Sequence, residues 1–247
     1  MPQPVSIILP KLQPLILDGS NGVRSQLLKL LRALPRHDVE DHTAQLLPYV
    51  RAGMTHLAAD IRLSSIDILS WLLETAGQDV VSCSGGWVKT ISCFCSVLGW
   101  HADDTAKWSS NRPSFGKAGT EGKPMVKTLQ CLADFLRTGM GDPIDSAAQE
   151  FVGSEAGWRF PLWDTQQHLI PKKSNPYGHL NLFGSARDED TEMYEDRDGR
   201  IRVFVRTFQA QVQKGLEAAR KEGGELGRYA AMAQKVLEEG FEGYEVD

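Results

Sequence analysis

The chain has 247 residues, of which 41% are hydrophobic and 24% charged, and its net charge is −5. This length allows one elongated fold or two small domains, and the acidic balance argues against a general electrostatic binder of nucleic acid. With only 23 Gly and 12 Pro, the composition excludes a collagenous class. No apolar run approaches the roughly 20 residues of a membrane helix. We expect neither a membrane span nor a signal segment, and the four cysteines are expected to be reduced, buried thiols of an intracellular protein.

Apolar residues recur at helical spacing along the first half of the chain. The periodicity predicts helices over 5–16, 23–34, 44–57, 61–73, 87–98 and 124–137. Gly77 and Gly99 are expected to end the fourth and the fifth helix. Trp71, Trp87 and Trp100 are expected to pack in the core, with a partner groove as the alternative. Because no segment alternates with period two, the sequence predicts an all-α fold.

The turns inside the first two helical pairs look alike. Asp18 precedes Arg24, Asp60 precedes Arg62, and the two arginines are 38 positions apart, close to the length of a HEAT or armadillo unit. The aspartate is expected to cap the second helix of its pair, and the arginine to bridge to the turn of a neighbouring unit. The pattern favours a HEAT/armadillo-like α-solenoid, with an irregular helical bundle as the alternative.

The pattern changes after Thr138. Many helix breakers and few helical faces follow, and the region is rich in aromatic residues, which argues against simple disorder. A helical pair is predicted over 201–219 and 226–239. We therefore predict three regions: HEAT-like helical repeats over 1–140, an extended and partly disordered segment over 141–200, and a C-terminal helical pair over 201–247 that completes the solenoid.

An acidic run over 188–198 lies at the end of the extended segment. Because like charges repel and remain hydrated, the run is interpreted as a solvated, mobile loop. A docking strip for a basic partner is the alternative.

No arrangement of residues indicates catalysis. Cys93 and Cys95 are two positions apart on a predicted helix, so their side chains point in different directions and cannot share a metal. The six histidines fit no metal-binding frame, 85–87 lacks the lysine spacing of a P-loop, and no nucleophile elbow is present. We therefore predict that the protein is not an enzyme and has no cofactor or catalytic or metal site.

Two stretches carry a more specific resemblance. The first runs from 49 to 82 and continues through Trp87-Val88-Lys89 and 97–100; the second joins 168–171 to 175–183. With the closing helix and 221–224, they make the chain similar to the Ipi-one/testis-expressed-ten family of pre-rRNA-processing proteins over about 7–237. The tryptophan-lysine pattern and the Leu-Ile-Pro…Leu-Phe element are specific in combination.

The resemblance implies a non-catalytic scaffold subunit of a nuclear complex, the Rix-one complex, in the nucleoplasm and nucleolus. Its implied partners are a helical-repeat scaffold subunit, a WD40 propeller and the pre-60S particle. The implied roles are processing of the second internal transcribed spacer and recruitment of the midasin AAA ATPase. A generic HEAT-repeat adaptor for transport or phosphatase assembly and a direct RNA-binding module are the alternatives.

The candidate site residues fall into two groups. The expected partner-binding residues, which would fill a groove with apolar side chains, are Trp158, Phe160, Trp163, Leu169, Ile170, Pro171, Tyr177, Leu180, Leu182 and Phe183. Contact with RNA or an acidic partner is expected at Arg51, Arg62 and Lys89.

The start of the chain also carries an expectation. Family members usually begin with a lysine-rich tail and a further helical segment, whereas this chain opens at a repeat-like pair. Partner docking is therefore the expected role, ahead of direct RNA contact. An uncovered first helix would expose Val5, Ile8 and Leu12.

Overall fold

The computed structural model describes residues 5–100, 122–141 and 190–242. These residues belong to one compact unit made of 1–141 and 190–247, and the second unit, 142–189, lies outside the described residues. Every regular element in the described ranges is a helix and no strand occurs there, which confirms the all-α prediction. The elements are α1 (Val5–Leu12), the 3-10 helix η1 (Gln13–Leu17), α2 (Asn21–Arg32), α3 (Arg36–Met54), α4 (Ala59–Ser82), α5 (Trp87–Leu98), α6 (Gly122–Met140), α8 (Arg197–Thr207), α9 (Gln209–Glu222) and α10 (Gly224–Phe241).

Two glycines expected to end helices behave differently. Gly99 ends α5 in the left-handed conformation, with φ of 72°, which glycine adopts without steric cost. At Gly77 the expected helix end is a kink: the preceding residue, Ala76, has non-helical φ of −137° and ψ of 39°, and a second helical stretch then continues to Ser82. A Cβ at Gly77 would lie 2.8 Å from the methyl carbon of Thr138, so this glycine allows α4 and α6 to pack closely.

The predicted C-terminal pair consists of three helices. The first predicted helix is divided at Phe208, whose ring centroid lies 6.4 Å from that of Phe204. The turn at Gly223 and Gly224 is as predicted, and both residues have positive φ. The break between α8 and α9 therefore falls at a buried aromatic residue, and no glycine or proline indicates it in the sequence.

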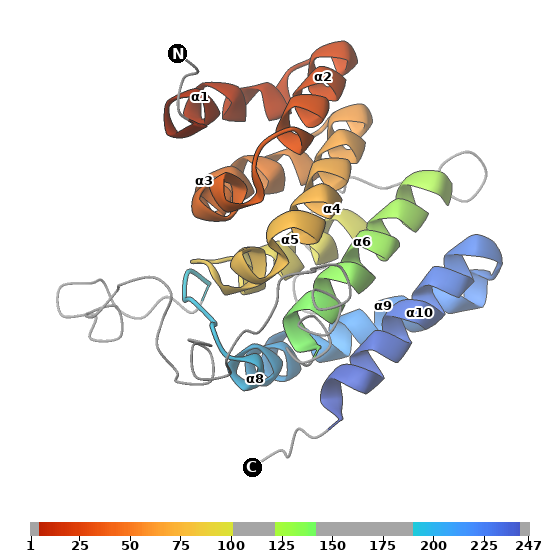
Figure 1. Ribbon diagram of the computed structural model, residues 1–247. Helices are drawn as coiled ribbons and strands as arrows, with labels where there is room; N and C mark the ends of the chain where they lie inside the picture. Colours follow the sequence, from red (N-terminus) through yellow and green to blue (C-terminus); the bar gives the residue numbers. More distant parts are fainter. Residues whose placement is uncertain (1–4, 101–121, 142–189, 243–247) are drawn as a thin grey trace, which may run out of the picture. The chain divides into compact units, whose positions relative to one another are not determined.

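Contacts join the helices in two series. α1 contacts α3, α3 contacts α5, and α5 contacts both α8 and α9; in parallel, α2 contacts α4, α4 contacts α6, and α6 contacts α10. Figure 1 shows α2, α4, α6 and α10 following one another across the unit. The helices α3 and α4 also pack against each other, as do α9 and α10.

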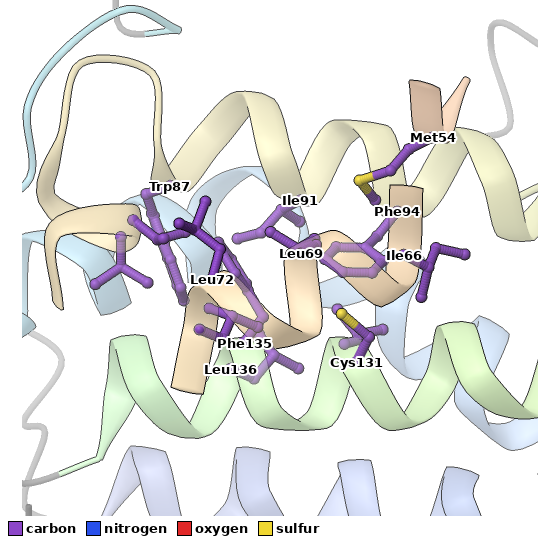
Figure 2. Packing of buried hydrophobic residues seen from close by; sticks show 14 of the residues in the cluster. Met54, Ile66, Leu69, Leu72, Trp87, Ile91, Phe94, Cys131, Phe135 and Leu136 are labelled. Carbon is purple, nitrogen blue, oxygen red and sulfur yellow. The ribbon is translucent and has the colours of Figure 1, made fainter. Parts of the chain in front are cut away.

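Trp87, at the start of α5, is one of the largest fully buried side chains of the core. Its ring is fully buried and stacks on Phe135 of α6, with 5.1 Å between the ring centroids. Figure 2 shows this pair beside Leu72 of α4. Trp71 is also buried and Trp100 is half-buried against the core, so the core prediction is confirmed for Trp71 and Trp87 and in part for Trp100.

The four cysteines are free thiols. Cys95 and Cys131 are buried, and burial raises the pKa of each to about 12. Burial also raises the pKa of Cys93, which is half-buried like Cys83. Because the thiolate is the reactive form, Cys95 and Cys131 remain protonated and unreactive at neutral pH.

A helix that crosses a bilayer needs about 20 mainly apolar residues, and this requirement applies to each helix of the described ranges. None of them is by itself both long and apolar enough, although the bent pair α4 and α5 would qualify on length and composition together. Both helices contribute many buried residues to the core.

Candidate interaction surfaces

The repeated turns meet through Arg24. Its side chain is fully buried, and its guanidinium donates to the carboxylate of Asp60 at 2.5 Å and to the hydroxyl of Ser64 at 3.0 Å. It also donates to the backbone oxygen of Asp18 at 2.5 Å. The arginine of the first turn therefore holds the aspartate of the second, so the predicted link from Arg24 to the other turn is confirmed.

The capping prediction for the two aspartates is wrong. Asp18 accepts a hydrogen bond from the backbone N–H of Ser20, which precedes α2. Asp60 lies inside the first turn of α4, where Ala58 is the capping residue. Asp60 is therefore placed to receive Arg24 and to complement the positive end of the α4 dipole.

This contact predicts a pH dependence of stability. The hydrogen bond from Arg24 lowers the pKa of Asp60 below 3.8. A lowered pKa in the folded state means that the stabilisation is complete above the unfolded value and is lost as the pH falls through the folded value. We expect the free energy of unfolding of Asp60→Asn to lie below that of the wild type at pH 6, and the difference to shrink steadily below pH 3.8.

Urea unfolding at a series of pH values measures this difference. Asp41→Asn, at an exposed position of α3, supplies the background effect of removing a surface carboxylate. The prediction would be contradicted if the difference in free energy of unfolding between wild type and Asp60→Asn exceeded this background at pH 6 and were equally large at pH 3.

The residues expected to contact RNA or an acidic partner separate into two places. Arg51 and Lys89 lie together beside Gly85, where a Cβ would be 3.4 Å from a guanidinium nitrogen of Arg51 and 3.0 Å from Cδ of Lys89. Arg51 donates to the backbone oxygen of Gly85 at 2.5 Å. Arg62 is only 7% exposed and donates to the backbone oxygens of His56 and Leu57, in the turn between α3 and α4. Contact with RNA or an acidic partner at these residues stays a prediction.

The described part of the acidic run packs on the helices, in place of the mobile loop that the sequence favoured. We call residues 190–196 the acidic strap. The backbone N–H of Gly85 donates to the backbone oxygen of Glu192, and the hydroxyl of Ser84 donates to the backbone oxygen of Thr191. The side chain of Tyr194 is buried. The strap therefore lies beside the α4–α5 turn, whose Gly85 is also next to Arg51 of α3 and Lys89 of α5.

Arg200 and Arg197 anchor the strap and the start of α8. Arg200 is buried, and its guanidinium donates to the backbone oxygens of Gly139 at 2.6 Å, Tyr194 at 2.8 Å and Glu195 at 2.9 Å. Arg197 donates to the backbone oxygens of Met140 and Gly240. Burial lowers the pKa of Arg200 to about 10, which leaves the guanidinium charged at neutral pH.

Comparison with known proteins gives the chain a family. A family model described as a Rix1 complex component involved in 60S ribosome maturation matches residues 37–136. The pre-rRNA-processing protein ipi1 of Aspergillus fumigatus is 58% identical over 243 residues, which cover 97% of this chain and 70% of that protein. The chain belongs to the Ipi1 family. The Ipi1 proteins of Sclerotinia sclerotiorum and Chaetomium thermophilum are 52% and 43% identical, and the matches cover 99% and 95% of this chain and 71% and 68% of those proteins.

The Ipi1 family model runs from the first turn of α3 to Leu136, four residues before the end of α6. It includes Trp87, Arg51 and Lys89, while Arg24 and Arg200 lie outside the matched range. The resemblance inferred from the sequence is therefore confirmed. All ten expected partner-binding residues, from Trp158 to Phe183, lie outside the described residues.

Within 5–100, 122–141 and 190–242, no group of three or more His, Cys, Asp or Glu side chains could hold a metal ion.

Proposed function

We propose that this Ipi1-family protein is a non-catalytic scaffold subunit of the Rix1 (Rix-one) complex. In this complex it would act in maturation of the 60S ribosomal subunit. The observation that carries the proposal is the match to relatives named pre-rRNA-processing proteins over 97% of the chain, together with the family description as a complex component. A nuclear location, in the nucleoplasm and nucleolus, is proposed because a protein that acts in pre-rRNA processing must be present where pre-rRNA is processed.

The helical unit is proposed to be a HEAT-like solenoid. Two features support this: the two parallel series of helix contacts and the link from Arg24 to the turn that contains Asp60. In repeat proteins, each unit contacts mainly its neighbours and the array offers long surfaces to partners. The three-region division at 140 and 200 is kept as a proposal, with the amendment that the strap and the start of α8 belong to the helical unit.

The partners follow from the same proposal. They are a helical-repeat scaffold subunit, a WD40 propeller, the midasin AAA ATPase and the pre-60S particle, and the process is removal of the second internal transcribed spacer. The aromatic residues between Trp158 and Phe183 are proposed to bind the protein subunits, because large aromatic side chains dominate the energetics of protein interfaces. The protein would supply surface and geometry, while ATP hydrolysis takes place on the ATPase.

A replacement experiment tests the proposal. The tagged chain would be expressed in Aspergillus fumigatus while its own ipi1 is repressed, and pre-rRNA and co-purifying proteins would be analysed. We expect the processed large-subunit rRNA to be restored and the Rix1-complex subunits to be recovered. Accumulated spacer-containing precursor, with importins or phosphatase subunits in the purified material, would favour the HEAT adaptor instead.

A variant of the same strain tests the aromatic segment. Replacing both Trp163 and Phe183 by Ala is expected to reduce recovery of the complex subunits, whereas Leu57→Ala, at an 88% exposed position between α3 and α4, is the matched control. Equal recovery from both strains would contradict a docking role for the two aromatic residues. If rRNA processing were restored and the aromatic variant still recovered the complex subunits, the proposed role in ribosome assembly would be supported. The docking surface would then lie outside Trp163 and Phe183.

A further inference from the structure

An apolar groove lies between the first two helices. It has a volume of about 360 Å³ and opens to solvent. Its lining residues come from the α1–η1 segment and from α2, and they are Leu12, Leu15, Gly22, Val23, Gln26, Leu27 and Leu30. Gln26 is the one side chain of this lining with a polar group. We call this feature the α1–α2 groove.

The groove coincides with a concentration of exposed apolar side chains. Five large hydrophobic residues are exposed among those described, and Ile7, Val23 and Leu30 belong to α1 and α2. Val23 and Leu30 line the groove and are 37% and 45% exposed. The side chains expected from the sequence to be exposed, Val5, Ile8 and Leu12, are half-buried instead. Contiguous exposed apolar surface of this kind marks interaction sites, whereas single exposed residues do not.

The other faces of these helices are already covered. α1 packs on α3, and α2 packs on α4. Within the helices the backbone N–H and C=O groups are bonded along the helix, so the groove offers no free edge for an added strand. An occupant must therefore bind through apolar side chains, as an amphipathic helix does when its apolar face enters a groove between two helices.

Charge around the groove limits the chemistry of that helix. In residues 5–34, the exposed charged side chains are Lys11, Lys29 and Arg32, all cationic. Lys11 is adjacent in sequence to the lining residue Leu12, and Lys29 to Leu30. The remaining charges are engaged locally, since Arg24 pairs with Asp60 and Asp18 accepts from Ser20. A helix with acidic flanks would be attracted here and a basic one repelled.

We propose that the α1–α2 groove docks an amphipathic helix of another protein, with leucine-type residues on one face and acidic residues beside them. The apolar face would cover Val23 and Leu30. The acidic flanks would lie over Lys11 and Lys29. This site is separate from the surface formed by Arg51, Lys89 and the strap, and its existence does not depend on the role in ribosome assembly.

Peptide binding to the whole chain tests the proposal. The probe is a fluorescein-labelled amphipathic peptide of about 18 residues, five helical turns, with Leu at i, i+3, i+4 and i+7 spacing and Glu at the flanking positions. A second peptide carries Lys in place of Glu. By fluorescence anisotropy at low salt, we expect the acidic peptide to bind at least about tenfold more tightly than the basic one, and the gap to narrow as salt is added.

Variants locate the binding site. The double variant Val23→Gln/Leu30→Gln is expected to weaken binding of the acidic peptide by about tenfold or more, since apolar contact is lost at two exposed positions. The exposed Leu57→Gln is the matched control and should leave binding unchanged. Lys11→Glu/Lys29→Glu should reverse the preference between the two peptides. Circular dichroism verifies that each variant remains folded, which exposed positions favour.

Several outcomes would overturn the proposal. They are absence of binding up to about 100 µM peptide, equal binding of both peptides, and binding unaffected by the groove variants. Two further measurements identify other occupants. A dimer in sedimentation velocity that the double variant abolishes would assign the groove to a second copy. Slow labelling of a Leu30→Cys thiol in the folded chain would show that other residues of the chain fill it. Either result would also overturn the proposal.

Discussion

Replacing Trp87 by Ala is expected to lower the free energy of unfolding by about 3–5 kcal/mol, the range for large aromatic residues removed from a core. The ring is fully buried, stacks on Phe135 and lies 6.4 Å from Phe204, so three helices lose contacts at once. The indole N–H also donates to the backbone oxygen of Arg200 at 2.9 Å, and the substitution leaves that oxygen without this donor. Trp87 therefore joins α5 to both α6 and α8.

Chemical denaturation measures the change in free energy of unfolding. Two further variants separate the contribution of the aromatic ring from that of the N–H donor and supply a surface control. Trp87→Phe keeps an aromatic ring and loses the N–H donor, so we expect it to retain more stability than Trp87→Ala. Leu57→Ala, at an exposed position, is expected to change stability by less than about 0.5 kcal/mol. A loss below about 1 kcal/mol for Trp87→Ala would show that the core does not depend on this ring.

Much of the fold could be predicted because amphipathic helices carry their own signal. Spacing of apolar residues indicated α5 from Trp87 to Leu98, and Gly99 ended it as expected. At Gly77 the same rule located a kink, at Ala76, but not the end of α4, because local sequence does not distinguish a glycine that ends a helix from one that admits a neighbour. Gly139 is a second case, since a Cβ there would lie 2.1 Å from the Trp87 ring. Only the tertiary contact shows that its small size is what matters.

The interaction surfaces show the same limit. The link from Arg24 to the second turn could be predicted because the Asp and Arg of the two turns recur at a similar spacing in the sequence. The position of Lys89 beside Arg51 could not be predicted, because the two residues belong to different helices and come together only through the tertiary packing around Gly85. The role of Arg200 was missed for a related reason. Its partners are backbone oxygens, which every residue possesses, and Gly139 is far from Arg200 in sequence.

Arg200→Met is expected to lower the free energy of unfolding by about 2–4 kcal/mol, because hydrogen bonds that involve a charged donor contribute about 1.5–3 kcal/mol each while removal of a buried charge recovers part of the loss. The variant leaves the backbone oxygens of Gly139, Tyr194 and Glu195 without the guanidinium. The oxygens of the strap can regain water only if the strap moves away from the helices. We therefore expect a local effect in addition to the global one.

Hydrogen exchange separates the two effects. Amides of the strap and of Gly85, which donates to Glu192, should exchange faster in Arg200→Met under conditions in which α4 remains protected. Arg200→Lys should restore only part of the protection, since a single ammonium group lacks the planar fork that reaches several carbonyls. Arg202→Met, at an exposed position of the same helix, is the matched control. If the strap were as well protected in Arg200→Met as in this control, the buried guanidinium would not hold the strap in place. The contact between the strap and the α4–α5 turn would then be maintained by Ser84, Gly85 and Tyr194 alone.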